Sequence, residues 1–255
     1  AVELFHNFTL IHDDIMDQAP LRRGLPTVHT KFGMNTALLS GDVMLIKAYE
    51  YVSRISTKHQ SEVLHLFNQT AREVCEGQQL DMDFENRDQV AIDEYLRMIE
   101  LKTSVLLAAS LQLGSMLGGA TQRNQERLYE FGRKLGLAFQ VQDDYLDAFG
   151  DPEKFGKQVG GDILANKKTF LLIHALEVAD PSTKAELMQL MQENPADKVA
   201  RILGFFRKTG VDAWALELKK RFLNEAMSAL DDIAVLSVRK KPLIDLAHYL
   251  IQREH

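Results

Sequence analysis

The chain has 255 residues, of which 45% are hydrophobic and 26% charged, and its formal net charge is −6. This composition is typical of a globular protein with a sizeable core, and the negative charge argues against a general nucleic-acid binder. No apolar run approaches the roughly 18 residues of a membrane span, and no signal peptide is recognisable. Cys75 is the only cysteine, which excludes an internal disulfide and indicates a cytoplasmic protein.

Helical periodicity dominates the chain, whereas the alternation of β-branched residues that marks strands is weak. We predict helices over 2–17, 28–55, 59–84, 91–117, 122–148, 168–179, 183–193, 196–209, 211–235 and 242–253. All six prolines lie between these segments or at a helix start, and Asn194-Pro195 has the pattern of an N-cap followed by the first helical residue. These features predict an all-α, single-domain helical bundle over residues 1–255, without a β-hairpin.

The N-terminus reads as the interior of a helix. Ala1-Val2-Glu3-Leu4-Phe5 is not preceded by a serine, threonine, aspartate or asparagine that could cap the helix. We therefore expect the natural chain to begin earlier and an N-terminal segment to be missing here.

An acidic motif occurs twice. Asp13-Asp14-Ile15-Met16-Asp17 is followed 130 residues later by Asp143-Asp144-Tyr145-Leu146-Asp147, and each copy follows an apolar stretch. On a helix the first and last aspartates of each motif share a face, where like charges repel each other. Clustered carboxylate oxygens are the ligands that hard divalent cations require, so the repetition indicates metal binding.

Each predicted acidic helix runs into a loop that contains basic residues and glycines. The first loop, 18–27, contains Arg22-Arg23-Gly24. The second loop, 149–168, contains Lys157, Gly160, Gly161, Asp162, Lys167 and Lys168. Arginine makes bidentate contacts with phosphate and lysine supplies a mobile positive charge, so carboxylates and cations together indicate a diphosphate site.

In combination these residues resemble the trans-isoprenyl diphosphate synthases, or polyprenyl synthetases, of the short-chain geranylgeranyl or farnesyl type. The resemblance is carried, in chain order, by the first acidic motif with Arg22-Arg23-Gly24, then Gly77-Gln78, Lys102-Thr103, Phe139-Gln140 with the second acidic motif, Gly156-Lys157-x-x-Gly160-x-Asp162 and Asn166-Lys167. The family's upstream Gly-Lys-x-x-Arg motif has no counterpart in this chain, which agrees with a missing N-terminal segment. The resemblance implies a helical bundle of the isoprenoid synthase type with a central cavity.

The resemblance also implies the reaction, which is head-to-tail condensation of isopentenyl diphosphate with an allylic diphosphate. Mg²⁺ is the expected cofactor, with Mn²⁺ as a substitute, and a homodimer is the expected assembly. Three alternatives stay open. An HD-type phosphohydrolase would use His12-Asp13, a terpene cyclase would share the fold, and a non-catalytic subunit of a heteromeric synthase would share the ancestry.

Roles for individual residues follow from the resemblance. Those expected to take part in catalysis are Asp13, Asp14, Asp17, Asp143, Asp144, Asp147 and Lys102. Metal ligands are expected at Asp13, Asp14, Asp17, Asp143 and Asp147, with Asp14 and Asp147 as direct or outer ligands. Asp144 is expected to orient a lysine or water, and Asp162 to act as an outer partner of the metals. The allylic diphosphate is assigned to Arg22, Lys102, Lys157 and Lys167, with Thr103 and Gln140 beside it.

Isopentenyl diphosphate is assigned to Arg23 and His6. His6 lies seven residues before Asp13, almost on the same helical face, which supports this assignment. The resemblance further implies that residues just upstream of the first acidic motif close the tunnel for the growing chain, here Phe5, Phe8 and Thr9. An aromatic residue at position 8 beside a small one at position 9 resembles the geranylgeranyl-type synthases, which implies a C20 product. Phe5 keeps a C15 product open, with longer chains as the third choice.

Overall fold

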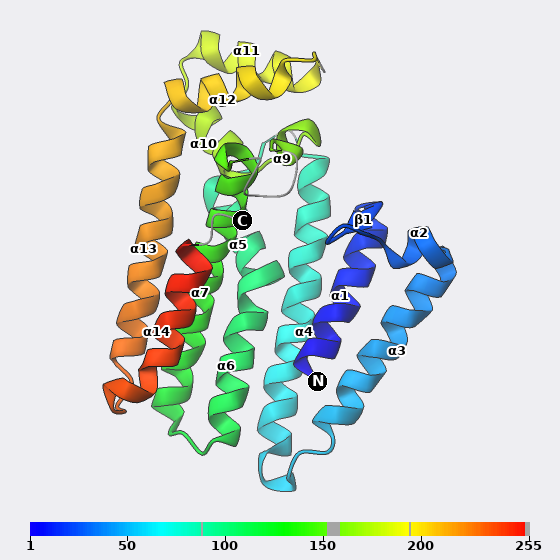
Figure 1. Ribbon diagram of the computed structural model, residues 1–255, viewed down its shortest axis with the longest axis vertical. Coiled ribbons are helices and arrows are strands. Elements are labelled where there is room, and N and C mark those ends of the chain that lie inside the picture. Colours follow the sequence, from blue (N-terminus) through cyan, green and yellow to red (C-terminus); the bar gives the residue numbers. More distant parts are fainter. Residues whose placement is uncertain (88, 152–158, 194, 253–255) are drawn as a thin grey trace. The chain divides into compact units, whose positions relative to one another are not determined.

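The structure is a computed structural model that describes residues 1–87, 89–151, 159–193 and 195–252. These residues are mostly helical, which confirms the predicted all-α fold (Figure 1). They group into two compact units, unit 1 with residues 1–72 and 116–119, and unit 2 with residues 73–115 and 120–255. We describe each unit separately, and a single domain over 1–255 stays a prediction.

Unit 1 is built around α1 (Val2–Met16), which packs lengthwise on α3 (Met34–Val52). The short helix α2 (Val28–Phe32) precedes α3, and the first part of α4 (Thr57–Glu85) completes the unit. The single helix predicted over 28–55 is therefore wrong. The chain breaks at Gly33, whose φ angle of 89° is incompatible with a continuous helix. Buried aromatic side chains of α1 and α4 form the centre of this unit.

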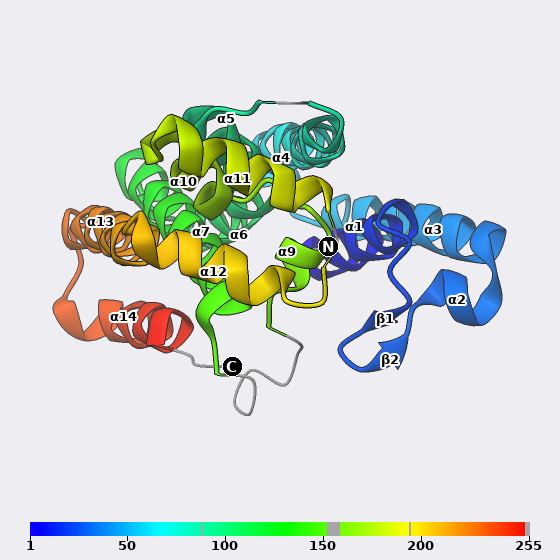
Figure 2. The same ribbon diagram turned by 90° about the horizontal axis from the view of Figure 1, so that it is seen from above.

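A small antiparallel hairpin lies between α1 and α2, so the prediction that no hairpin exists is wrong. Its strands are β1 (Leu21–Arg22) and β2 (Leu25–Pro26), and Arg22 pairs with Leu25. Arg23 and Gly24 form the turn with φ angles of 53° and 77°. Two consecutive positive φ angles are the signature of the two-residue turn that matches strand twist. Figure 2 shows the hairpin beside α2.

Unit 2 is organised around α7 (Gln122–Phe149), which packs along α13 (Val211–Asp231). The second part of α4 also belongs to this unit. Its other helical elements are α5 (Ile92–Ile99), the π-helix η1 (Glu100–Ser104), α6 (Val105–Leu117), α9 (Gly161–Leu164), α10 (Phe170–Val178), α11 (Pro181–Gln192), α12 (Lys198–Lys208) and α14 (Ser237–Gln252). One cluster of buried apolar side chains joins these elements into a core.

Two predictions about prolines are corrected by the structure. Helix α14 begins at Ser237 and includes Pro242, which was expected at a helix start. Helix α12 begins at Lys198 after Asp197, so Pro195 is not its first residue, and Asn194 lies outside the described residues. Pro181, by contrast, is the first residue of α11, with Asp180 as a hydrogen-bonded N-cap.

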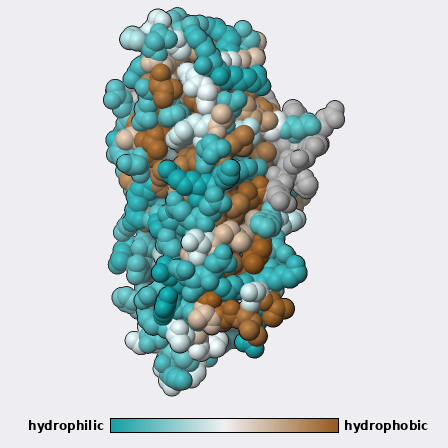
Figure 3. Space-filling view, turned by 90° about the vertical axis from the view of Figure 1, so that its left-hand side faces the viewer, coloured by the Kyte–Doolittle hydropathy of each residue, from teal (hydrophilic) through white to brown (hydrophobic). Residues whose placement is uncertain are grey.

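The surface around α13 and α14 carries an apolar patch near the end where one helix leads into the other (Figure 3). Leu236 and Val238 contribute most, since each is 71% exposed. Scattered apolar surface of this kind is normal for proteins. Among the described helices, none combines the length and hydropathy that a membrane crossing requires.

Candidate active site

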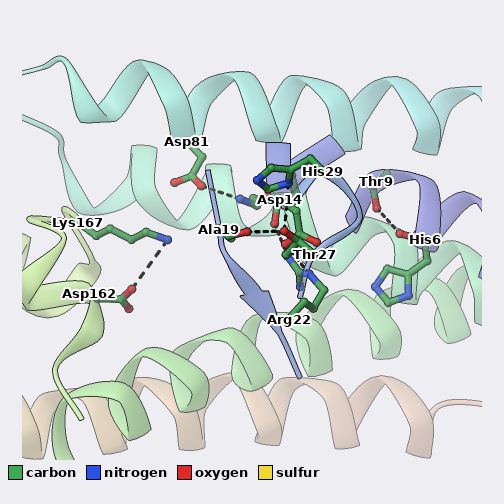
Figure 4. A network of polar contacts seen from close by, with 12 residues as sticks. His6, Thr9, Asp14, Ala19, Arg22, Thr27, His29, Asp81, Asp162 and Lys167 are labelled. Atoms are coloured by element: carbon green, nitrogen blue, oxygen red, sulfur yellow. Dashed lines mark hydrogen bonds and ion pairs between the residues drawn. The ribbon is translucent and has the colours of Figure 1, made fainter. Parts of the chain in front are cut away.

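The first acidic motif occupies the last turn of α1, where Arg22 of the hairpin contacts two of its carboxylates. Arg22 Nε donates to Asp14 Oδ1 at 2.7 Å, and a terminal guanidinium nitrogen donates to Asp13 Oδ2 at 2.9 Å (Figure 4). Asp14 is buried whereas Asp17 is exposed. The hairpin thus returns a positive charge to the motif and offsets the repulsion between neighbouring aspartates.

The base of the hairpin is fixed to the end of α1. The Thr27 hydroxyl donates to the Ala19 carbonyl at 2.7 Å, and the Ala19 N–H donates to the Asp14 carbonyl at 3.0 Å. Arg23 lies exposed in the turn, next to the partly buried Arg22. The two neighbouring arginines therefore have different surroundings.

The residues expected at the tunnel floor and beside isopentenyl diphosphate lie one to two turns upstream on α1. Phe5 and Phe8 are buried, with ring centroids 5.6 Å apart, and Phe67 of α4 packs edge-on against Phe5 at 5.5 Å. The Thr9 hydroxyl donates to the His6 carbonyl at 2.8 Å, and both side chains are half-buried. An aromatic cluster therefore closes this part of unit 1, and Phe67 is a member that sequence reasoning missed.

A cavity of about 390 Å³ lies in unit 2. Its lining combines acidic, basic and neutral residues: Asp81, Phe84, Glu85, Tyr95, Met98, Ile99, Lys102, Thr103, Gln140, Asp143, Asp144, Asp162, Ala165, Asn166, Lys167, Lys168 and Thr169. The sequence-predicted residues Lys102, Thr103, Gln140, Asp143, Asp144 and Lys167 are thus brought together. Lys157 lies outside the described residues.

Asp144 is the centre of a buried hydrogen-bond network. The Tyr95 hydroxyl donates to Asp144 Oδ2 at 2.6 Å, and the Gln140 amide donates to Asp144 Oδ1 at 2.9 Å. The Thr103 hydroxyl in turn donates to Gln140 Oε1 at 3.3 Å. Asp144 therefore orients Gln140, and no contact with a lysine is seen for it among the described residues.

The electrostatics of the cavity favour a bound cation. Burial, helped by the negative charge of Asp162, raises the pKa of Asp144 to about 8, against the opposing effect of its hydrogen bonds. Burial and the nearby charge of Asp147 also raise the pKa of Asp162 to about 6. Burial raises the pKa of Tyr95 well above its usual value, so this phenol stays a donor. The simultaneous ionisation of neighbouring carboxylates is unfavourable, and a bound cation stabilises their ionised forms.

The last aspartate of the second motif holds the turn that follows it. Asp147 Oδ2 accepts from the Asp162 N–H at 3.0 Å at the start of α9. The Lys167 ammonium lies 3.9 Å from Asp162 Oδ1, and the Lys167 N–H donates to the Asp162 carbonyl at 2.9 Å (Figure 4). Lys168 instead donates to the carbonyls at the end of α4, Phe84 at 2.9 Å and Glu85 at 3.1 Å. Both lysines line the cavity, but only the Lys167 ammonium lies beside a cavity carboxylate among the contacts described for this pair.

Lys102 lies in the π-helical segment η1, which is clamped between two other helices. Its ammonium pairs with Asp81 of α4 at 2.7 Å. A Cβ atom at Gly77 of α4 would lie 2.3 Å from the backbone nitrogen of Lys102. A Cβ atom at Gly136 of α7 would lie 2.7 Å from the Ser104 Cα atom. Only glycine permits these close approaches. The helix predicted over 91–117 therefore contains a π-turn, which is a local break in α-helical bonding.

The polar partners of the predicted residues were not visible in the sequence. Asp81 and Tyr95 contact residues 21 and 49 positions away, and neither belongs to a motif used above. Asn166-Lys167 was recognised as a pattern, but no role was assigned to Asn166. Only the fold brings these side chains together.

The donor set fits a cation that is held partly by substrate. Within the described residues, no group of three histidine, cysteine, aspartate or glutamate side chains forms a ready metal cage. Mg²⁺ characteristically binds through one or two carboxylates, water and substrate phosphates, rather than in an all-protein cage. Carboxylates next to lysines, as in the cavity of unit 2, and carboxylates next to an arginine, as at the end of α1 in unit 1, are each suited to such a metal-diphosphate pair.

Comparison with known proteins supplies the family. The polyprenyl synthetase family model matches residues 1–205. A short chain isoprenyl diphosphate synthase of Methanocaldococcus jannaschii is 48% identical over 192 residues, which are 75% of this chain and 58% of that protein.

Solved structures agree. Geranylgeranyl pyrophosphate synthetase from Pyrococcus horikoshii is 37% identical with a TM-score of 0.94, over 99% of this chain and 77% of that one. A polyprenyl synthase from Caulobacter crescentus, complexed with calcium and isoprenyl diphosphate, is 30% identical with a TM-score of 0.87. The match covers 100% of this chain and 77% of that one.

These matches confirm the isoprenoid synthase fold and support a short-chain trans-prenyltransferase with a geranylgeranyl product favoured. The HD-type phosphohydrolase alternative is wrong, because the match covers most of the chain and His12 contacts the Leu38 carbonyl of α3 at 3.2 Å. The chain belongs to the polyprenyl synthetase family.

Proposed function

We propose that the protein condenses isopentenyl diphosphate head to tail with an allylic diphosphate and releases a short all-trans prenyl diphosphate, with C20 as the main product. The observation that carries this proposal is the cavity of unit 2, where the carboxylates of Asp143 and Asp162 lie beside Lys102 and Lys167. In the reaction the allylic C–O bond breaks, the double bond of isopentenyl diphosphate attacks the resulting cation, and the released diphosphate takes the proton that is lost.

The proposed cofactor is Mg²⁺, with Mn²⁺ as a substitute. Asp13, Asp17 and Asp143 are its direct ligands, and Asp14 and Asp147 serve as direct or outer ligands. The Caulobacter crescentus relative was solved in complex with calcium and isoprenyl diphosphate, which supports a divalent cation as the cofactor. When bound, the cation neutralises the charge that develops on the leaving diphosphate.

The basic residues bind and orient the diphosphate. Asp13 and Asp14 use two of the five N–H donors of Arg22, so the remaining donors serve phosphate oxygens. Lys102 and Lys167 add point charges at the cavity, each close to an aspartate that limits its motion. Lys157 is also assigned to binding of the allylic diphosphate.

The allylic cation needs a site of negative electrostatic potential whose groups do not themselves react with it. Thr103 and Gln140 line the cavity and are fixed by the network that ends at Asp144. The π-turn at Glu100–Ser104 supplies backbone carbonyls released from α-helical bonding. Oriented oxygen atoms of this kind stabilise developing positive charge.

Incubation of the purified protein with isopentenyl diphosphate, Mg²⁺ and C5, C10 or C15 allylic primers tests the proposal, with mass analysis of the products. We expect incorporation of isopentenyl diphosphate from each primer and accumulation of C20. A product formed from the primer alone would identify a terpene cyclase. Absence of turnover unless a second, different subunit is added would identify a non-catalytic partner.

The two arginines of the hairpin are expected to serve different substrates. Arg23→Ala should raise KM for isopentenyl diphosphate more than KM for the allylic primer, because Arg23 is exposed in the turn and does not share the aspartate contacts of Arg22. Arg22→Ala should affect the allylic substrate most. Steady-state kinetics with each substrate varied in turn measures both values.

Arg→Lys at each position is the matched control, since lysine keeps the charge and loses the bidentate geometry. Equal changes of both KM values in Arg23→Ala would remove the assignment.

We also propose that the protein is a cytoplasmic homodimer. Support for the dimer comes from α2 and α3, whose exposed apolar side chains include Phe32, Met34, Leu38, Leu39, Val43 and Ile46. Leu39, Val43 and Ile46 follow one another at helical spacing and so form a continuous apolar stripe. An acidic substitution in this stripe should separate the subunits.

Val43→Glu should shift the molar mass measured by light scattering from twice the chain mass to the chain mass. The chain mass is 28.9 kDa. Val238→Glu is the matched control for added negative charge, because Val238 is 71% exposed on α14 and lies outside this stripe. A wild-type protein that elutes as a monomer at all concentrations would contradict the proposal.

A further inference from the structure

Lys198 is a buried lysine that the proposed reaction does not use. It is the first residue of α12 and is 1% exposed. Its ammonium donates to Asn166 Oδ1 at 2.6 Å and to the Met191 carbonyl at 3.3 Å. Burial of an ammonium group is unfavourable unless its donors are used, so these two contacts are retained in the folded state. The shorter contact is with Asn166, a residue that lines the cavity of unit 2.

Asn166 lies in the turn that follows α9. It lines the cavity beside Lys167, and its side chain is exposed. Its φ angle of 56° places it in the left-handed region, where asparagine is tolerated better than most residues. The turn is closed by a hydrogen bond of 3.2 Å from the Asn166 N–H to the Ile163 carbonyl.

The contact with Lys198 determines which way the Asn166 amide faces. An ammonium group has donors only, so the amide atom that it contacts is the oxygen. The amide nitrogen, with its two N–H donors, is therefore on the side away from the Lys198 ammonium. An amide that rotates freely would present its acceptor as readily as its donors, and an acceptor repels phosphate oxygens.

We propose that Asn166 donates a hydrogen bond to the diphosphate in the cavity and that Lys198 is the positioning residue that holds the amide in the donating orientation. This inference rests on the proposed function, since it assigns a further contact to the same diphosphate. The turn then presents two groups of matching chemistry side by side, the amide donors of Asn166 and the ammonium of Lys167.

Binding of inorganic diphosphate in the presence of Mg²⁺, measured by titration calorimetry, tests the inference without turnover. Asn166→Leu and Lys198→Met should each raise the dissociation constant about tenfold, the scale of one lost hydrogen bond to a charged group. The double variant should bind no more weakly than Asn166→Leu alone, because Lys198 acts only through Asn166. Lys208→Met, which removes one charge elsewhere on α12, should bind like the wild type.

Two results would overturn the inference. One is wild-type affinity in Asn166→Leu. Asn166→Gly, which suits the positive φ angle at this position, separates the loss of the amide from backbone strain, and thermal melting of each variant checks its fold. The other is a double variant whose loss equals the product of the single losses, which would indicate that Lys198 acts independently of Asn166. If the wild type binds diphosphate but does not condense the two substrates, the proposed function fails and this contact does not. If it condenses them while Asn166→Leu binds normally, only the contact fails.

Discussion

Asp13→Ala or Asp143→Ala should lower kcat at least ~100-fold, the scale of losing one main electrostatic stabiliser of a transition state. Each substitution removes a proposed metal ligand from the group that neutralises the leaving diphosphate. Chelation by EDTA should abolish turnover, and Mg²⁺ or Mn²⁺ should restore it. Initial rates with saturating substrates measure these effects.

The control is Asp245→Ala, an exposed aspartate of α14 that pairs with Lys241 outside the cavity. This variant should retain wild-type kcat. Full turnover of the wild type in EDTA would exclude the metal-dependent mechanism, and normal rates in both Asp13→Ala and Asp143→Ala would remove these residues from it.

The helical part of the fold was predictable because apolar residues at helical spacing identify helices over long segments. The helices predicted over 2–17 and 122–148 agree with α1 and α7 within a residue at each end. The break at Gly33 and the inclusion of Pro242 in α14 were not predictable in this way. Each feature depends on the tertiary contacts of a single residue, and the apolar periodicity continues without interruption past that residue.

The site was predictable where its chemistry repeats in the sequence. Two acidic motifs with following basic loops identified the carboxylates and cations, and the structure places Asp143, Lys102 and Lys167 around one cavity. The supporting shell was not predictable, because the Tyr95 contact with Asp144 and the Lys198 contact with Asn166 join residues 49 and 32 positions apart. Such pairs leave no local pattern, and only tertiary packing creates them.

Chain length is expected to depend on the aromatic cluster of unit 1. Phe8→Ala should lengthen the product beyond C20, and the Phe5→Ala, Phe8→Ala double variant should lengthen it further. The physical reason is space, since both rings are buried and in tilted contact on α1, with Phe5 also packed against Phe67. Removal of each ring opens apolar volume in which further C5 units can lie. Mass analysis of products from a C15 primer with excess isopentenyl diphosphate measures the distribution.

Loss of a buried phenylalanine costs about 3–5 kcal/mol of stability, so altered products must be separated from general loosening of the fold. Phe206→Ala in α12 is the matched control, because Phe206 is 1% exposed and lies in unit 2, outside the aromatic cluster. It should lower the melting temperature and leave the product at its wild-type length. If Phe8→Ala and the double variant also keep the wild-type length at undiminished rate, the floor lies elsewhere. A longer product in Phe8→Ala alone, without a further increase in the double variant, would place the floor at Phe8 and make Phe5 a purely structural residue.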